Sequence, residues 1–292
     1  MDEMSRSEAS KIWENLTIAD NFIFQKVMRK KRLCKRFIEK ILHIKIRKIM
    51  FPETEKGINI RRDSKSVRLD VYVEDDKGTL YDIEMQTTDY ADPAELPKRT
   101  RYYQAMMDID VLNKGEFYTK LRKTYIIFIC TFDSFDRNLS QYTFRETCAE
   151  DVTLEMGDET TKIFLNSKGR REGIDSDLAA FLDYIEGKAP KGKFTETIAN
   201  EVEVAKENKE MKVEYMTYYM ELRRSEERGM EKGMEKGRME GRKEGRMEGR
   251  MEGRMEALKS LVVSKLLSLK DAAAAAGMSE EAFKKVADLR QD

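Results

Sequence analysis

Two early segments of the chain alternate between apolar and polar residues. Residues 68–74 and 79–88 both follow this period of two, which is typical of a β-strand with one buried face. Asp-Lys-Gly stands between them at 76–78, and glycine readily adopts the left-handed backbone conformation that a three-residue hairpin loop requires. We therefore expect an antiparallel hairpin.

The length of this loop predicts the register of the hairpin. A three-residue loop pairs Asp75 with Thr79 and therefore Asp70 with Glu84. Directly paired residues have Cβ atoms roughly 5 Å apart, a separation at which two carboxylates can share one divalent cation. Gln86 falls on the same face, two residues further along the strand.

The other apolar patterns predict helices around a buried strand. Residues 15–42 suit one or two amphipathic helices, and another helix begins at Pro97. Residues 124–132 are almost continuously apolar and rich in β-branched and aromatic side chains, as in a strand that is buried on both faces. Shorter elements follow, namely strand-like pieces at 142–144 and 162–165 and a short helix at 177–185. Together these elements predict an α/β domain over residues 1–188.

The later part of the chain has a different composition. Charged residues make up 38% of the sequence and concentrate beyond about residue 200, so we expect a charged helical connector at 189–228. Residues 229–256 form a low-complexity helical repeat with a glycine at every fourth position. Each glycine costs about 1 kcal/mol relative to alanine, so a lone helix is marginal here. The repeat either joins copies of the chain in a homo-oligomer or is a flexible linker.

The terminal segment, residues 257–292, predicts two short helices that resemble a helix-turn-helix unit. Ser268 and Ser279 are expected N-caps of these helices. A DNA-reading helix offers its first residues to the bases. Here those residues are Glu280 and Glu281, which repel phosphate. The pattern therefore favours a docking or structural unit over one that reads DNA.

The overall charge does not by itself indicate a nucleic-acid partner. Lysine plus arginine and aspartate plus glutamate number 55 each, so attraction to DNA must come from local clusters. One basic cluster lies within residues 26–48, where Lys26 and Arg29 are candidate phosphate contacts. The alternative, a solvated helix face, is slightly favoured by the pattern.

Counts of other residue types exclude several kinds of site. The only histidine is His43, which argues against histidine clusters and Ser-His-Asp hydrolysis and suggests a structural role. The three cysteines have no C-x-x-C spacing, so they predict neither a disulfide framework nor a zinc site. No apolar run could span a bilayer and no signal peptide is evident. We expect a cytoplasmic protein without membrane contact.

The carboxylates of the hairpin provide the remaining route to hydrolysis. Asp70 and Glu84, helped by the main-chain carbonyl of Met85, would bind Mg²⁺, with Mn²⁺ as the alternative ion, and lower the pKa of a bound water. Gln86 would orient that water. Taken alone this spacing also fits a polar outer face of a sheet, so it needs support from its surroundings.

Four segments carry a resemblance to a known family. The runs LTIADNFIFQKVM, RLDVYVEDDKGTLYDIEMQ, LPKRTRYYQAMMDIDVLNKGEFYTKL and TYIIFICTFDSF, in this order over about residues 16–184, resemble the recombination-promoting nuclease/transposase family, a branch of the PD-(D/E)XK nucleases. The resemblance implies a restriction-endonuclease-like fold, a mixed sheet flanked by helices. It also implies Mg²⁺-dependent cleavage of DNA.

The resemblance assigns roles to individual positions. Asp70 matches the metal-binding aspartate of the family and Glu84 its second acidic ligand. Gln86 occupies the position where the wider superfamily has lysine, and a neutral amide cannot stabilise the charge of the transition state as an ammonium would. The site could borrow a cation from Lys98 or Arg99 in the next helix.

The first helix of the family usually adds two adjacent acidic residues. This sequence has Asp20 followed by Asn21, so Asp20 is the candidate and Asn21 is a departure. The main hypothesis is an endonuclease that promotes recombination or belongs to a mobile-element protein. The alternatives are a catalytically weak nuclease-fold protein that binds DNA or assembles as an oligomer, and a purely structural interaction protein.

Overall fold

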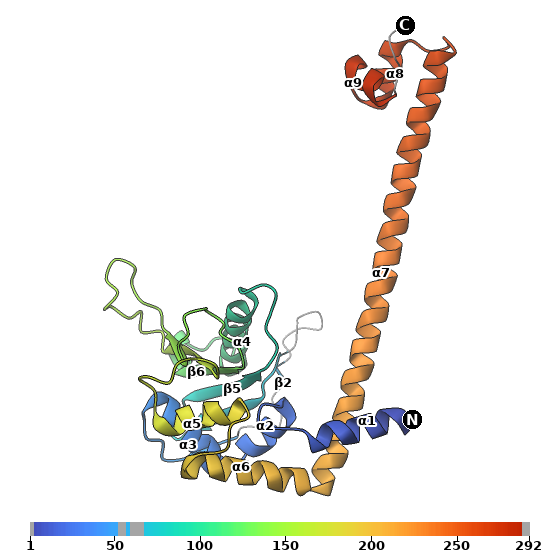
Figure 1. The fold of residues 1–292 in the computed structure, drawn as a ribbon. Coiled ribbons are helices and arrows are strands. Elements are labelled where there is room, and N and C mark those ends of the chain that lie inside the picture. Colours follow the sequence, from blue (N-terminus) through green and yellow to red (C-terminus); the bar gives the residue numbers. More distant parts are fainter. Residues whose placement is uncertain (1–2, 52–56, 59–66, 288–292) are drawn as a thin grey trace. The chain divides into compact units, whose positions relative to one another are not determined.

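A six-stranded mixed sheet forms the centre of the first part of the chain. The computed structural model describes residues 3–51, 57–58 and 67–287, and within them the strand order is β1-β4-β5-β6-β8-β7 (Figure 1). Strands β5, β6 and β8 run parallel, whereas β4 pairs antiparallel with β5 and with β1, and β7 with β8. The strands are β1 Ile49–Met50, β4 Val71–Asp75, β5 Leu80–Gln86, β6 Thr124–Cys130, β7 Gln141–Phe144 and β8 Thr160–Asn166, with β2 Gly57–Ile58 and β3 Val67–Arg68 in a separate pair.

Helices cover both faces of this sheet. Figure 1 shows α4 on one face and α2, α3, α5 and α6 on the other. The helices are α1 Glu3–Glu14, α2 Asn21–Met28, α3 Lys31–Leu42, α4 Glu95–Val111, α5 Ser176–Ile185, α6 Gly192–Glu207, α7 Lys209–Val263, α8 Leu269–Ala276 and α9 Glu280–Val286, with a 3-10 turn η1 at Tyr118–Lys120. The expected α/β fold, a mixed sheet flanked by helices, is confirmed.

The core beneath α4 explains why this helix lies where it does. Tyr103 and Met107 of α4 belong to one buried apolar cluster with Ile126 and Phe128 of β6. The Tyr103 and Phe128 ring centroids are 6.1 Å apart. Because β6 is buried along its whole length, as its continuous apolar run predicts, α4 can pack on one of its faces while other helices cover the second.

The predicted hairpin register is confirmed. Val71 of β4 pairs with Ile83 and Tyr72 pairs with Asp82, the register that places Asp70 opposite Glu84. Gly78 has φ +82°, the left-handed conformation that the loop requires. The ladder ends at Val71, however, so Asp70 lies just beyond the paired strand.

The first compact unit extends beyond the expected boundary. It reaches Tyr218 rather than residue 188, because α6 buries an apolar face that includes Phe194 and Ile198. The indole Nε1–H of Trp13 also donates to the Lys206 carbonyl over 3.2 Å. Helix α6, which lies within the expected connector at 189–228, is therefore part of the first unit.

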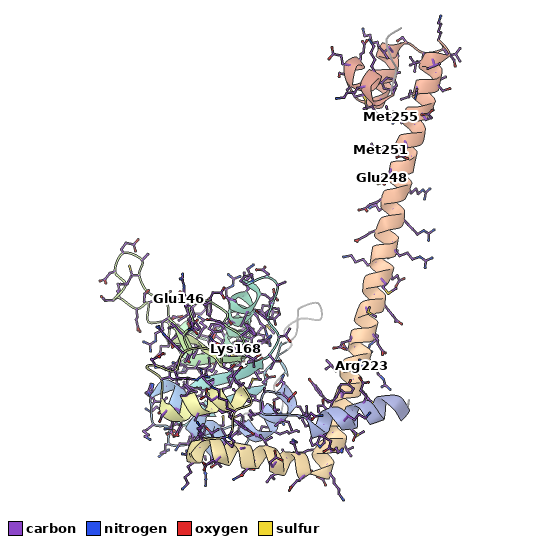
Figure 2. The ribbon with its side chains drawn as sticks, in the orientation of Figure 1. Glu146, Lys168, Arg223, Glu248, Met251 and Met255 are labelled. Atoms are coloured by element: carbon purple, nitrogen blue, oxygen red, sulfur yellow. The ribbon has the colours of Figure 1, made fainter. Side chains whose placement is uncertain are left out.

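The second unit, residues 219–292, contains the repeat and the terminal helices. The repeat lies within α7, and the side chains of Glu248 and Met251 project outward from the helix (Figure 2). At the terminus, Phe283 of α9 is fully buried in a small apolar cluster, and Ser268 and Ser279 cap their helices as predicted. None of the helices described is both long and apolar enough to cross a membrane.

Candidate active site

Two hydrogen bonds tie Asp70 to Glu84 and to Met85 at the open end of the hairpin. The Asp70 N–H donates to Glu84 Oε1 over 2.8 Å, and the Met85 N–H donates to Asp70 Oδ2 over 3.2 Å. Side-chain oxygens thus take the place of carbonyl oxygens in the β-ladder. Both side chains are buried, at 8% and 1% exposure, so the fold holds the two carboxylates in fixed positions.

Helix α2 contributes amides to the Asp70 carboxylate. Asn21 Nδ2 and Gln25 Nε2 each donate to Asp70 Oδ1 over 3.1 Å. The carboxylate of Asp20 instead accepts a hydrogen bond from the Thr17 backbone N–H over 2.6 Å. The structure therefore does not bring Asp20 to the carboxylate pair, because Asp20 precedes the helix and fixes the turn before it.

Arg99 of α4 reaches the carboxylate pair from the other side. Its Nη2 lies 2.9 Å from Glu84 Oε2 and its Nη1 donates to Gln86 Oε1 over 2.8 Å. The guanidinium carbon lies 4.9 Å from the Tyr103 ring centroid, four residues further along the helix. Lys98, the other expected cation, is exposed, and the described contacts include none between it and Glu84 or Gln86.

Asp82 is a buried acid of this cluster that sequence reasoning did not select. It is 0% exposed, and neither carboxylate oxygen accepts a hydrogen bond from an N–H or O–H group of the described residues. The Glu84 carboxyl is its neighbour on the same strand and affects its pKa. The signal was present, since strand alternation placed Asp82 on the face of Glu84 and Gln86, but no motif singled it out.

The cluster carries excess negative charge in a water-poor environment. Burial, then the neighbouring Asp82 and Asp70 carboxyls, raises the pKa of Glu84 well above its usual range. Burial also raises the pKa of Asp82 and of Asp70. If all three were ionised, the Arg99 guanidinium would leave two negative charges, the charge that one divalent cation neutralises.

The donor set suits a hard divalent cation. Carboxylate oxygens are the ligands that Mg²⁺ prefers, and its remaining positions are usually filled by water and substrate phosphate. Asp70 and Glu84 provide two such ligands, and no group of three or more ligand side chains is preformed among the described residues. The Met85 N–H bonds to Asp70. The Met85 carbonyl remains a predicted ligand.

The basic stretch on α2 and α3 is engaged in ion pairs within the domain. Lys26 pairs with Glu214 of α7 and also lies over the Phe22 ring. Lys30 pairs with Glu201 of α6, Lys40 contacts two aspartates of the α5 N-terminus, and Arg29 also has a partner. These ion pairs favour the interpretation as a helix face without a role in DNA binding, and a phosphate contact of Lys26 or Arg29 remains a prediction.

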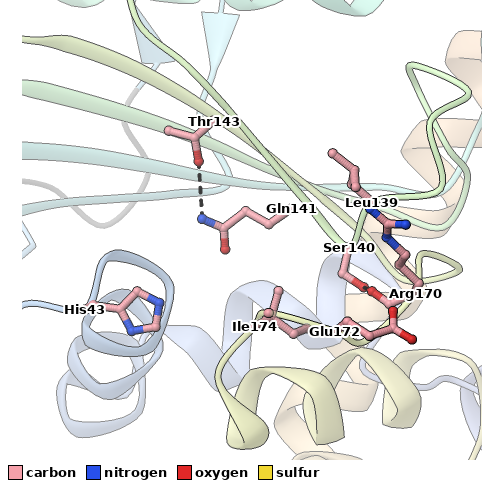
Figure 3. Close-up of a pocket in the computed structure, with 9 residues that line it drawn as sticks. His43, Leu139, Ser140, Gln141, Thr143, Arg170, Glu172 and Ile174 are labelled. Carbon is pink, nitrogen blue, oxygen red and sulfur yellow. Dashed lines mark hydrogen bonds between the residues drawn. The ribbon is translucent and has the colours of Figure 1, made fainter. Parts of the chain in front are cut away.

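A roomy pocket of the same unit lies elsewhere. It has a volume of about 680 Å³ and lies among His43, the edge strand β7 and residues 170–174 (Figure 3). None of the three buried acids lines it. A smaller pocket of about 90 Å³ is lined by Tyr90 and Leu96, and Tyr90 accepts a hydrogen bond from Arg99. The small pocket therefore adjoins the cluster, whereas the large one is separate.

The comparison with family models decides the affiliation of the chain. A model described as PD-(D/E)XK nuclease family transposase matches residues 21–239, which include every residue of the cluster. The chain belongs to this PD-(D/E)XK family. Comparison with curated proteins and with solved structures gives no match. Gln86, the position at which the resemblance predicts a departure from the lysine of the superfamily, accepts a hydrogen bond from Arg99.

Proposed function

We propose that this PD-(D/E)XK protein is a divalent-metal-dependent DNA endonuclease. The supporting observation is a pair of hydrogen bonds, from the Asp70 N–H to the Glu84 carboxylate and from the Met85 N–H to the Asp70 carboxylate, which hold two buried carboxylates at the end of the hairpin. We further propose Mg²⁺ as the ion, DNA as the substrate, and a role in recombination or in a mobile element, in line with the transposase family that the chain matches.

Each residue of the cluster has a distinct part in this proposal. Asp70 and Glu84 hold the cation, which when bound polarises the scissile phosphate and makes a water molecule more acidic. Asn21 and Gln25 hold the Asp70 carboxylate in place through Oδ1 and leave its charge intact. Gln86 orients the attacking water from the same strand face.

Arg99 provides the cation that Gln86 lacks. The side chain of Arg99 is 25% exposed, whereas that of Glu84 is 2% exposed, so Arg99 lies between the buried acids and solvent. From there it can contact a phosphate group and stabilise the charge that develops during cleavage. A positive group delivered by α4 would thus replace the lysine that the superfamily carries on β5.

A plasmid-nicking assay tests this proposal. We expect nicking by the parent protein with Mg²⁺ and none with EDTA, and we expect Asp70→Ala and Glu84→Ala to abolish nicking while the proteins stay folded. Glu146→Ala is the matched control, because Glu146 is an exposed carboxylate on the β7–β8 loop (Figure 2). A Glu84→Ala protein that nicks as fast as the parent would show that this cluster is not the active site.

One observation favours a second candidate, a nuclease-fold protein that binds DNA with little or no turnover. Arg99 already bonds to Glu84, Gln86, Tyr90 and Tyr103, so four of its five N–H donors are occupied within the protein. If the assay shows DNA binding and Mg²⁺ binding by the parent but no nicking, this second function is the correct one.

A further inference from the structure

The segment between α4 and β6 presents two neighbouring aromatic side chains to solvent. Phe117 is 80% exposed and Tyr118 is 83% exposed, the two highest values among the large apolar side chains that the structure describes. The short turn η1 begins at Tyr118 and Phe117 caps it, so local backbone structure keeps the two residues together. Neither ring packs on another described aromatic ring.

Positive charge surrounds these aromatic residues. Residues 113–123 contain four basic residues and one acid, Glu116. The Glu116 carboxylate accepts a hydrogen bond from the Asn113 N–H over 2.6 Å. Arg122 pairs with Glu74, but in the described part of the chain neither Lys114 nor Lys120 lies within ion-pair distance of a carboxylate. These two lysines can therefore bind an external anion.

A second exposed apolar segment of the same domain provides a contrast. The loop between β7 and β8, residues 145–159, exposes Val152, Leu154 and Met156 at 58–74%. It has no aromatic residue, and its charged residues are one arginine and six acids. That loop repels phosphate, whereas the 113–123 segment combines aromatic rings with cations.

We infer that residues 113–123 form a platform for single-stranded DNA. Every base offers a flat face that stacks on an aromatic ring, and lysines beside the rings neutralise the backbone phosphates. Phe117 and Tyr118 would stack the bases, and Lys114 and Lys120 would contact the phosphates. This combination suits unpaired bases, because the bases of a duplex are already stacked on each other.

The position of the platform is compatible with the proposed nuclease function, on which this inference rests for the identity of the nucleic acid. Helix α4 carries Arg99 near its start and ends at Val111, so the platform begins roughly 18 Å further along the helix at 1.5 Å per residue. At the rise of a strand in B-form DNA that distance corresponds to about five nucleotides, and an extended single strand covers it with fewer. A strand held at the platform could therefore extend to the carboxylate cluster.

Fluorescence anisotropy with a labelled oligothymidylate of about 20 nucleotides, longer than a typical binding site for a single strand, tests the inference. The full chain is titrated in EDTA, so that no cleavage occurs. We expect the double variant Phe117→Ala, Tyr118→Ala to raise the dissociation constant roughly tenfold or more, and Phe117→Trp, Tyr118→Trp to retain binding. The matched control is Val152→Ala, Leu154→Ala, which removes exposed apolar side chains from the acidic loop and is expected to bind as the parent does.

The inference fails if the alanine variant binds the oligonucleotide as tightly as the parent, or if the control variant loses binding equally. A change in molecular mass with unchanged DNA binding would also overturn it, since the rings would then contact another protein chain. Loss of binding by the alanine variant supports the platform even if Glu84→Ala still nicks plasmid. Retained binding refutes the platform and leaves the nuclease proposal standing.

Discussion

The carboxylate cluster and the glycine repeat are both rich in charge, but they place it in opposite environments. In the cluster, Asp70, Asp82 and Glu84 are at most 8% exposed. In the repeat, the side chains from 229 to 254 are exposed, and a Cβ added to any glycine from Gly229 to Gly253 would meet nothing within 4 Å. The charged side chains of the cluster are thus buried, and those of the repeat are exposed to water.

Buried charges require a physical explanation, and exposed charges do not. Exposed charges cost little because water solvates them. A buried carboxylate costs several kcal/mol unless a counter-charge compensates it, and the described cluster has one guanidinium for three acids. An arrangement that weakens the fold by itself is expected where a ligand, here a cation, completes it.

The geometry of the repeat favours a spacer over a continuous helical seam. A period of four residues advances about 40° beyond a full turn of an α-helix, so the glycine column circles the helix in roughly 54 Å. A two-stranded coiled coil has a supercoil pitch of about 150 Å. A partner helix could not follow the column along its length, which argues against a homo-oligomer held together by this repeat.

After substitution of Asp70 or Glu84, the largest loss of nicking activity is expected from substitution of Arg99. Arg99→Ala removes the one cation in contact with Glu84 and Gln86 in the described structure, and we expect the single-turnover nicking rate to fall about a hundredfold to a thousandfold. Arg99→Lys keeps the positive charge but not the simultaneous contact with Glu84 and Gln86, so its nicking rate should lie between those of the parent and of Arg99→Ala. An Arg99→Ala enzyme with the parental rate would remove Arg99 from the proposed mechanism.

Gln86 should matter less, because it supplies orientation and no charge. We expect Gln86→Ala to slow nicking roughly ten- to a hundredfold through misplacement of the water. Gln86→Lys restores the residue of the superfamily and should raise the rate. Both variants are compared with the parent by the single-turnover nicking rate. A Gln86→Ala variant that is as inactive as Glu84→Ala would mean that Gln86 has a role beyond orientation.

The stability of the cluster should depend on pH. Because the pKa values of Asp70, Asp82 and Glu84 are raised, the folded chain binds more protons at these groups than the unfolded chain does. Their contribution to the free energy of unfolding is therefore present at low pH and is lost as pH rises from about 4, the usual carboxyl pKa, through the raised values.

Thermal unfolding in EDTA measures this contribution. Other carboxylates of the domain have lowered pKa values and act in the opposite sense, Asp183 among them, so the useful quantity is the difference between the parent and an Asp70→Asn, Glu84→Gln variant. We expect the variant to gain stability over the parent as pH rises, and Mg²⁺ to stabilise the parent alone. A difference that does not change with pH would contradict the raised pKa values.

The smallest effect is expected in the repeat. Gly245→Ala with Gly249→Ala should stabilise the helix by about 1 kcal/mol per substitution, which circular dichroism detects as a gain in helix content. Nicking should not change, since no repeat residue belongs to the cluster. If light scattering shows that these substitutions lower the molecular mass, the glycines pack against another chain and the repeat is more than a spacer.

The sequence by itself determined the local geometry. Loop chemistry at Gly78 predicted the pairing that places Asp70 opposite Glu84, and this was confirmed. The continuous apolar run predicted the buried strand β6, and serine spacing predicted the caps at Ser268 and Ser279. These features depend on backbone conformation and on hydrogen bonds between residues that are close in the chain, so a short segment contains all the information they need.

Tertiary structure alone decided which charges meet. Lys26 pairs with Glu214, 188 residues away in the chain, and Asp82, one of several polar residues of its strand in the sequence, is fully buried. Arg99 could be named as a candidate, but its bonds to Glu84 and Gln86 depend on how α4 packs on β6. Charge pairing and burial depend on contacts between distant segments, which periodicity along the chain does not encode.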